Sequence, residues 1–258
     1  IYDEEVEEFL KFVRFAHQNG IDAVLIQDLG MYDLVHQKFP DLEIHASTQM
    51  HIHNLEGALV AKKLGFKRIV LARETDIDTI KEIKEQTGLD VEVFVHGSLC
   101  VSYSGQCLFS SLVGGRSGNR GACAGSCHLP YDIVDKNNEV LNDTKKYPLS
   151  MKDLCAIVSI GKLMDIGVNS FKIEGRMKSK EYVYLVTKLY RKAIDSYLDN
   201  KKVTIDYDVL DKLKKVFNRE YTLGFLNNVN NNDVINGKQP NNVGVKIGKV
   251  VKLTKTNA

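Results

Sequence analysis

Four of the five cysteines lie close together in a polar, glycine-rich stretch of the chain. Six, fifteen and three residues separate Cys100, Cys107, Cys123 and Cys127, and Cys155 follows after a gap of twenty-seven residues. Thiolates are soft ligands that hold Zn²⁺ and iron–sulfur clusters. An odd, clustered set of cysteines does not suit a disulfide framework, so the pattern favours metal binding or redox chemistry.

The spacing of the cysteines favours an iron–sulfur cluster over zinc. Structural zinc sites usually use two Cys-x-x-Cys pairs, whereas here three residues lie between the closest pair and the set extends to Cys155. We expect a [4Fe–4S] cluster on Cys100, Cys107, Cys123 and Cys155, with Cys127 as the alternative fourth ligand and Zn²⁺ as the alternative metal. A role as ordinary buried thiols is disfavoured, because the stretch has few apolar neighbours.

Charged residues in the cysteine stretch and at a predicted strand end form a second group of candidates. Arg116 and Arg120 lie among the cysteines, and the predicted strand 170–173 is accompanied by Lys172, Glu174, Arg176 and Lys178. Arginine and lysine at such positions grip phosphates or carboxylates, and these residues are the predicted substrate contacts. The alternative is a solvated surface with ion pairs.

Further polar candidates belong to other predicted strands. His45, Gln49 and Asn54 follow a strand and are expected to hydrogen-bond a substrate, or to serve as core and capping residues. Glu92 alternates with apolar residues inside a strand, so it is either paired with a cation or tuned for acid–base work. We take Glu92, His96, His45 and Arg176 as the catalytic candidates.

His96 and Cys100 also suggest a peptidase, with the thiol as nucleophile and the imidazole as base. The sequence has neither a His-Glu-x-x-His nor a Gly-x-Ser-x-Gly motif. A metal held by four thiolates has no open position for an attacking water. Redox chemistry is therefore the favoured interpretation.

Apolar strands alternate with amphipathic helices along most of the chain, and these elements position the candidates. Strands are predicted over 23–27, 42–46, 68–72, 91–95 and 170–173, and helices over 4–18, 55–64, 76–86, 154–164 and 181–197. This alternation is typical of a parallel sheet built from βαβ units. We predict an α/β fold with a (β/α)8 TIM-barrel-like core that is truncated at its N-terminus, since a barrel needs eight strands and only five are visible. A doubly wound sheet is the alternative.

Three parts are predicted along the chain. Residues 1–200 form the partial barrel core with a cysteine-rich loop at 96–131, and residues 201–242 form a helix and an Asn-rich linker. Residues 243–258 open a small C-terminal β domain, because 245–253 alternates like a strand. The chain begins at Ile1 in an acidic helix, which indicates that it starts inside a longer protein.

The composition is that of an ordinary soluble protein. Apolar residues make up 43% and charged residues 26%, with a net charge of +2, so neither disorder nor a polybasic protein is indicated. The sequence lacks an apolar run long enough for a membrane helix and a signal peptide at its start. A cytoplasmic location without membrane association is therefore expected.

The stretch from His96 to Ser110, His-Gly-Ser-Leu-Cys-Val-Ser-Tyr-Ser-Gly-Gln-Cys-Leu-Phe-Ser, resembles the signature of peptidase family U32, first described as collagenase-like proteases. Blocks that begin at His45, Arg116 and Lys152, and the block Phe-Lys-Ile-Glu-Gly-Arg-Met-Lys-Ser at 171–179, are similar to family blocks in the same order. They cover most of residues 20–200. One departure is Ala-Gly-Ser-Cys-His at 124–128, where the family often has Ala-Gln-Pro-Cys-Arg.

The resemblance implies a barrel core, a [4Fe–4S] cluster on four cysteines and oxygen-independent hydroxylation. The substrate it implies is an RNA pyrimidine, such as a tRNA wobble uridine or an rRNA cytidine, or an intermediate of ubiquinone synthesis. RNA and a small-molecule co-substrate are then the expected partners. A collagenase-like peptidase and an adaptor protein with a structural metal are the alternatives.

Overall fold

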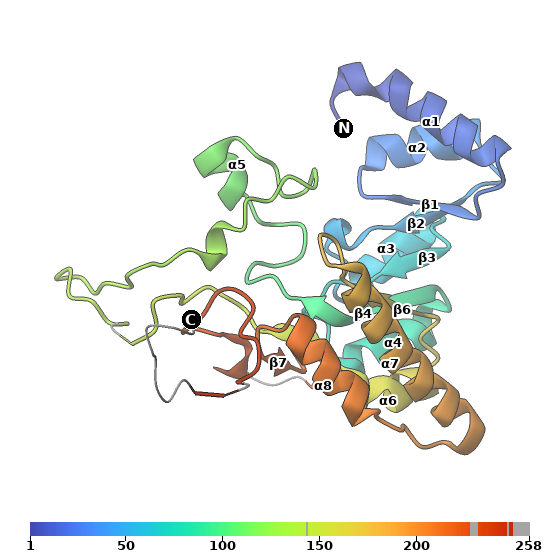
Figure 1. Ribbon diagram of the computed structural model, residues 1–258. Coiled ribbons are helices and arrows are strands. Elements are labelled where there is room, and N and C mark those ends of the chain that lie inside the picture. The colour runs from blue at the N-terminus through green and yellow to red at the C-terminus, as the bar shows by residue number, and fades with distance from the viewer. Residues whose placement is uncertain (143, 228–231, 247, 250–258) are drawn as a thin grey trace, which may run out of the picture.

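The computed structural model describes residues 1–142, 144–227, 232–246 and 248–249 (Figure 1). Its centre is a mostly parallel sheet of seven strands. The parallel strands that pair in chain order are β1 (Ala23–Ile26), β2 (Glu43–Ala46), β3 (Arg68–Val70), β4 (Asp90–Ser98) and β6 (Ser170–Ile173). All of these strands therefore end at the same edge of the sheet.

The long strand β4 organises the second half of the sheet. It pairs with β3 and β6 in parallel, and its last residues pair in antiparallel fashion with β5 (Asp153–Cys155). The short strand β7 (Tyr221–Thr222) adds to β5 in parallel. A Cβ at Gly97 would collide with the carbonyl oxygen of Glu174, so the glycine allows the chain after β6 to approach β4 closely.

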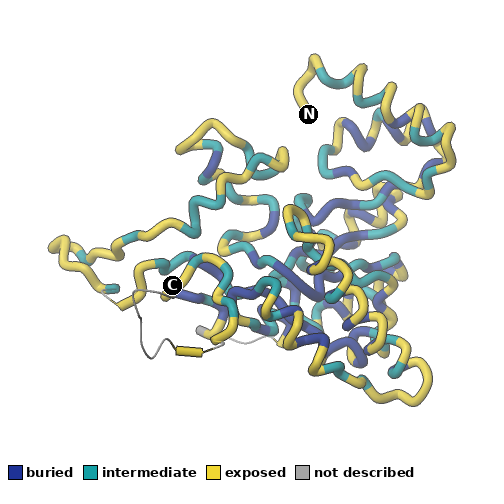
Figure 2. The backbone as a smooth tube through the Cα atoms, in the orientation of Figure 1, coloured by how far each residue is buried: buried dark blue, intermediate teal, exposed yellow. Residues whose placement is uncertain are grey.

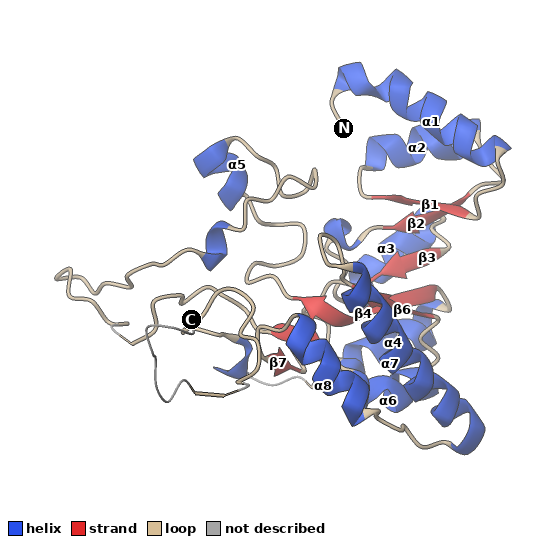
Figure 3. Ribbon diagram, viewed as in Figure 1, coloured by secondary structure: helices blue, strands red, loops and turns tan. Residues whose placement is uncertain are grey.

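Helices connect the strands and pack against one another in a layer (Figure 3). Contacts link α3 to α4, α4 to α6, α6 to α7 and α7 to α8. The helices are α1 (Val6–Gln18), α2 (Leu29–Lys38), α3 (Leu55–Leu64), α4 (Ile77–Thr87), α5 (Phe109–Gly114), α6 (Ile160–Ile166), α7 (Lys180–Asn200) and α8 (Tyr207–Val216). None of the helices in the described part of the chain is both long and apolar enough to cross a bilayer.

Side-chain caps fix where several helices begin. Asp76 accepts a hydrogen bond from the Thr79 amide at 2.9 Å, and Ser179 caps α7 in the same way. The apolar face of α7 is fully buried, as the helical spacing predicts. The core lies between this helix layer and the sheet.

The α/β class and the five predicted core strands are confirmed. The predicted helix 154–164 was wrong in its first part, because the backbone of residues 153–155 pairs with β4 and the helix begins at Ile160. The described strands form an open sheet with β1 at one edge, and a closed barrel is not confirmed. Most of the strand predicted over 245–253 lies outside the described residues, so the C-terminal β domain stays a prediction.

The cysteine-rich insertion between β4 and β5 projects from the sheet with little regular structure (Figure 1). Most of its residues are exposed or half-buried, in contrast to the mostly buried strands β4 and β5 that flank it (Figure 2). It leaves the sheet at the carboxyl end of β4, which is the edge where parallel α/β sheets bind ligands.

Candidate metal centre

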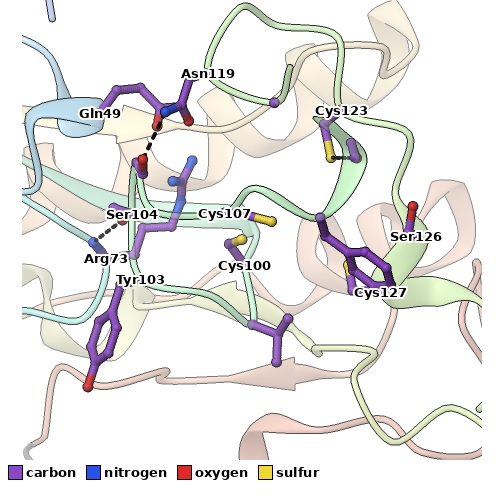
Figure 4. A pocket seen from close by; sticks show the side chains of 15 residues that line it. Gln49, Arg73, Cys100, Tyr103, Ser104, Cys107, Asn119, Cys123, Ser126 and Cys127 are labelled. Carbon is purple, nitrogen blue, oxygen red and sulfur yellow. Dashed lines mark hydrogen bonds between the residues drawn. The ribbon is translucent and has the colours of Figure 1, made fainter. Parts of the chain in front are cut away.

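Four cysteines of the insertion line one pocket of about 150 Å³. Cys100 comes from the chain directly after β4 and Cys107 from the segment before α5, while Cys123 and Cys127 come from the returning chain. In Figure 4, Cys100 and Cys107 lie on one side of the pocket and Cys123 and Cys127 on the other. The structure thus brings together residues that lie up to twenty-seven positions apart.

Polar contacts anchor the first turn of the insertion to the ends of β2 and β3. Glu74 accepts hydrogen bonds from the backbone amide and the hydroxyl of Ser104, at 2.8 and 3.0 Å. Gly105 has a φ of 77°, and a Cβ there would collide with the carbonyl of Gln49. The side-chain amide of Asn119 donates a hydrogen bond to the carbonyl oxygen of Gly105 at 2.8 Å. These contacts hold both sides of the pocket against the sheet.

The thiols of Cys100 and Cys127 are neutral in the absence of a metal. Burial raises the pKa of Cys100, and it raises the pKa of Cys127 to about 11, with a further contribution from the neighbouring thiols. A bound metal reverses this, because it deprotonates the thiols that coordinate it. Cys123 already accepts hydrogen bonds from the Gly125 amide at 3.4 Å and from the Ser110 hydroxyl at 3.8 Å, contacts that tune iron–sulfur centres.

A single ion and a cluster need different spacings of the sulfur ligands. Two thiolates on one Zn²⁺ lie at most about 4.6 Å apart, twice the zinc–sulfur distance. Among the described residues, no group of three or more His, Cys, Asp or Glu side chains is gathered closely enough for one ion. The four thiols line one small pocket, and four thiolates are the usual ligand set of a [4Fe–4S] cluster.

Cys155, the predicted fourth ligand, lies apart from this pocket. It is 9% exposed, belongs to the hydrophobic core and pairs in register with His96. His96 precedes Cys100 by four residues, and four extended residues span up to about 13 Å. The alternative fourth residue, Cys127, is the one that the structure brings to the other three.

His96 is buried in a cage of tyrosines, away from the cysteine pocket. It is 1% exposed, its Nδ1 lies 3.2 Å from the hydroxyl of Tyr190, and its ring packs on Tyr182 and Tyr221. Burial lowers its pKa to about 3, so the imidazole is neutral at physiological pH. None of the contacts described for the His96 ring is with Cys100, so the ring does not serve as a base for the Cys100 thiol.

Three other candidates have structural contacts. Glu92 forms an ion pair with Lys172 at 3.0 Å and accepts a hydrogen bond from Ser170 at 2.8 Å. Burial opposes its ionisation, but these two contacts outweigh burial and hold the pKa of Glu92 below its usual value. His45 lies 3.4 Å from Glu43, and exposed Asn54 caps α3. The structure does not bring these side chains to the cysteine pocket.

A larger open cleft of about 650 Å³ adjoins the cysteines at the carboxyl edge of the sheet. Its lining includes Cys100, Cys123 and Cys127 together with Gln49, Arg73, Glu174, Arg176 and Lys178. Of these, the sequence predicted Gln49, Glu174, Arg176 and Lys178 as substrate contacts. The cations outnumber the single carboxylate, so the cleft suits an anionic ligand.

Arg73 links the cleft to the cysteine pocket and was missed by sequence reasoning. It lines both cavities, pairs with Glu174 at 3.3 Å and stacks on Phe94 at 3.9 Å. Burial lowers its pKa, and nearby Glu174 partly offsets that effect. The sequence feature that could have identified Arg73 is its position three residues after β3, because every parallel strand ends at this edge of the sheet.

The other two predicted arginines lie outside the cleft lining. Arg120 forms a bidentate ion pair with Glu5 at 2.7 and 3.0 Å and stacks on Tyr2. Arg116 is exposed on the insertion. Arg176, in contrast, donates to the carbonyl of Gly121 at 2.9 Å and so connects the chain after β6 with the insertion.

The similarity of this chain to known proteins extends over both the sheet and the cysteine-rich insertion. The model of peptidase family U32 matches residues 1–236. The 23S rRNA 5-hydroxycytidine C2501 synthase of Escherichia coli is 37% identical over 99% of this chain and 39% of its own length. The tRNA hydroxylation protein P1 of Bacillus subtilis is 37% identical over 85% of this chain and 53% of its own. A collagenase of Porphyromonas gingivalis is 34% identical over 87% of this chain and 57% of its own. The chain thus spans roughly half the length of these relatives or less.

Proposed function

The chain belongs to peptidase family U32, and from this premise we propose that it is the cluster-binding core of an enzyme that hydroxylates a pyrimidine base in RNA. One observation carries the proposal: four cysteines surround a pocket that opens beside a cationic cleft. Two of the relatives are named for tRNA or rRNA hydroxylation, which supports the same reaction class.

The proposed cofactor is a [4Fe–4S] cluster on Cys100, Cys107, Cys123 and Cys127. Cys127 is preferred to Cys155 as the fourth ligand because it shares the pocket with the other three. When bound, the cluster supplies electron transfer. Arg73 lies between the pocket and the cleft, where its charge would stabilise thiolates and attract an anionic substrate.

The cleft is the proposed binding place for the base and a co-substrate. Hydroxylation inserts an oxygen atom into a C–H bond and oxidises the base by one electron pair. In an oxygen-independent reaction another oxidant takes up that electron pair, and we propose a small-molecule co-substrate that donates the oxygen atom to the base and is itself reduced by two electrons. Arg176 and Lys178 would hold the RNA backbone or an anionic co-substrate, with Gln49 as a hydrogen-bonding partner.

The distribution of charge supports an RNA partner. Residues 1–95 carry eight more acidic than basic side chains, whereas residues 96–258 carry ten more basic than acidic ones. The nearly neutral net charge of the chain therefore conceals a basic part, residues 96–258, which includes the insertion and the chain after β6. A basic part of this kind attracts polyanions, and RNA binding should weaken as salt is added.

The sheet is proposed to be a segment of a (β/α) barrel. Its parallel strands pair in chain order, and the helices α3, α4, α6, α7 and α8 contact one another in succession. A doubly wound sheet would instead reverse its strand order and carry helices on both faces. The open edge at β1 is where further barrel strands would pair.

The peptidase alternative rests on the name of the family and of the collagenase relative. The proposed dyad of Cys100 and His96 has no support in the geometry, because His96 contacts Tyr190 in the core. An adaptor with a structural metal would share the cysteine pocket but would have no use for the cationic cleft.

Nucleoside mass spectrometry tests the proposed reaction. The protein is produced in a host that lacks its own RNA hydroxylases, and digested tRNA and rRNA are searched for a pyrimidine one oxygen atom heavier. We expect such a nucleoside with the parent protein and its loss with Arg176→Gln. The exposed Arg116→Gln is the matched control and should retain the product. No new nucleoside from a protein with an intact cluster would contradict the proposed reaction.

A further inference from the structure

A single buried arginine contacts the residues that flank the segment 100–127, which carries four of the cysteines. Arg219 lies just before β7 and is 7% exposed. One of its terminal nitrogens donates to the hydroxyl of Ser98, the last residue of β4. The other donates to Nε2 of His128 at 2.8 Å, where the returning chain leaves the pocket.

A buried carboxylate fixes this arginine in place. Asp153 of β5 is 2% exposed and accepts from the backbone amide and from Nε of Arg219, both at 3.1 Å. The Asp153 side chain also lies 3.0 Å from a terminal nitrogen of the guanidinium. The whole guanidinium is therefore held in one orientation.

His128 completes the network as a neutral imidazole. An arginine only donates hydrogen bonds, so Nε2 of His128 must accept and Nδ1 carries the proton. Nδ1 donates a hydrogen bond to the hydroxyl oxygen of Ser150, which lies 2.8 Å away. The contact between Arg219 and His128 thus has a defined direction at neutral pH.

We propose that Arg219 is a positioning residue that clamps the two ends of the segment 100–127 and so sets the distance between Cys100 and Cys127. Ser98 precedes Cys100 by two residues, and His128 directly follows Cys127. The clamp therefore acts on the residues that open and close the pocket. The functional role of the clamp rests on the proposed use of these cysteines as ligands of one cluster, whereas its geometry does not.

The planar guanidinium is what makes the clamp work. Its rigid fork offers donors in several directions at once, so it reaches Ser98, His128 and Asp153 together. A lysine at this position would retain the charge opposite Asp153 but would lack the fork. Arg219→Lys therefore removes the clamp while it keeps a positive charge opposite Asp153.

Cross-linking of the metal-free protein tests the clamp without using the cluster. In a background with Cys107, Cys123 and Cys155 replaced by Ser, a short bis-maleimide joins the two remaining thiols. We expect Arg219→Lys to slow this cross-linking at least about tenfold, since small misplacements have large effects on intramolecular reactions. Arg191→Lys, at an exposed ion pair on α7, is the control and should leave the rate unchanged.

Two further variants cover the case in which Arg219→Lys does not fold. Ser98→Ala and His128→Phe each remove one arm, and circular dichroism identifies the variants that keep the native fold. Slower cross-linking in either folded variant supports the clamp, and parental rates in all folded variants overturn it. If the parent protein binds no iron but the variants still cross-link slowly, the cluster proposal fails and the clamp stands.

Discussion

Replacing His96 with Phe should remove a defined part of the sensitivity of the fold to acid. The imidazole is 1% exposed, and burial lowers its pKa from the ordinary 6.5 to about 3. The unfolded chain therefore binds a proton at mildly acidic pH that the folded chain excludes. Because the unfolded state holds more protons in this range, stability falls as pH decreases from about 6.5 towards 3.

The size of this loss follows from the two pKa values. A pH of about 5 lies about one and a half units below the imidazole pKa of the unfolded chain. Protonation of the unfolded chain therefore lowers the free energy of unfolding by about 2 kcal/mol relative to neutral pH. His128, whose pKa burial and nearby Arg219 lower to about 4, adds a smaller loss, because it is only half-buried and solvent screens its charge. His96→Phe should thus lose about 2 kcal/mol less than the parent between pH 7.5 and pH 5.

Urea unfolding of the reduced, metal-free protein at both pH values measures this difference. Phe fits among Tyr182, Tyr190 and Tyr221, and the Tyr190 hydroxyl keeps its hydrogen bond to the carbonyl of Val95 at 2.7 Å. The exposed His36→Gln serves as the control and should show the full loss of the parent. An equal loss of stability in His96→Phe and the parent would refute the buried, neutral imidazole.

Three further predictions concern the site. Cys127→Ser should abolish iron binding in an anaerobic iron assay, whereas Cys155→Ser should retain it; the reverse result would restore Cys155 as the fourth ligand. Gly105→Ala should cost about 1–3 kcal/mol in urea unfolding because its φ is left-handed and its Cβ meets backbone. Gly20→Ala, with a similar φ and open space, should cost less, and equal losses would argue against the close approach. Burial lowers the pKa of Lys178 to about 8, so RNA binding in filter assays should weaken as pH rises through 8. Lys178→Met should remove that dependence and lower the salt slope by about one, and an unchanged pH profile would exclude Lys178 as a phosphate contact.

The core of the fold follows from local signals in the sequence. Runs such as Arg68-Ile-Val and helical spacing in residues 181–197 predicted elements that the structure contains. The segment at 153–155 could not be predicted, because its strand conformation depends on pairing with β4. Short strands of this kind have too few residues for a periodic pattern, and a long-range partner decides their conformation.

The candidate site was predictable where chemistry and spacing coincide. Cys100, Cys107 and Cys123 formed a recognisable pattern, and Gln49 was identified from its place after a strand. The choice between Cys127 and Cys155 could not be made from spacing, since the register of β5 on β4 determines how deep Cys155 lies.

Arg219 shows what sequence reasoning cannot reach. Its partner Asp153 lies sixty-six residues earlier, and no motif connects the two. Only the pairing of β5 with β7 brings them together, through Asp153 opposite Tyr221. Long-range polar networks of this kind depend on tertiary packing and leave no periodic trace in the sequence.

Anaerobic purification followed by an absorption spectrum and quantitation of iron, sulfide and zinc tests the central claim most directly. The account predicts a brown protein with broad absorption near about 400 nm and about four irons and four sulfides per chain. The same analysis of Cys127→Ser should show the iron lost. A colourless parent protein that contains one zinc or no metal would contradict the cluster and with it the proposed hydroxylation.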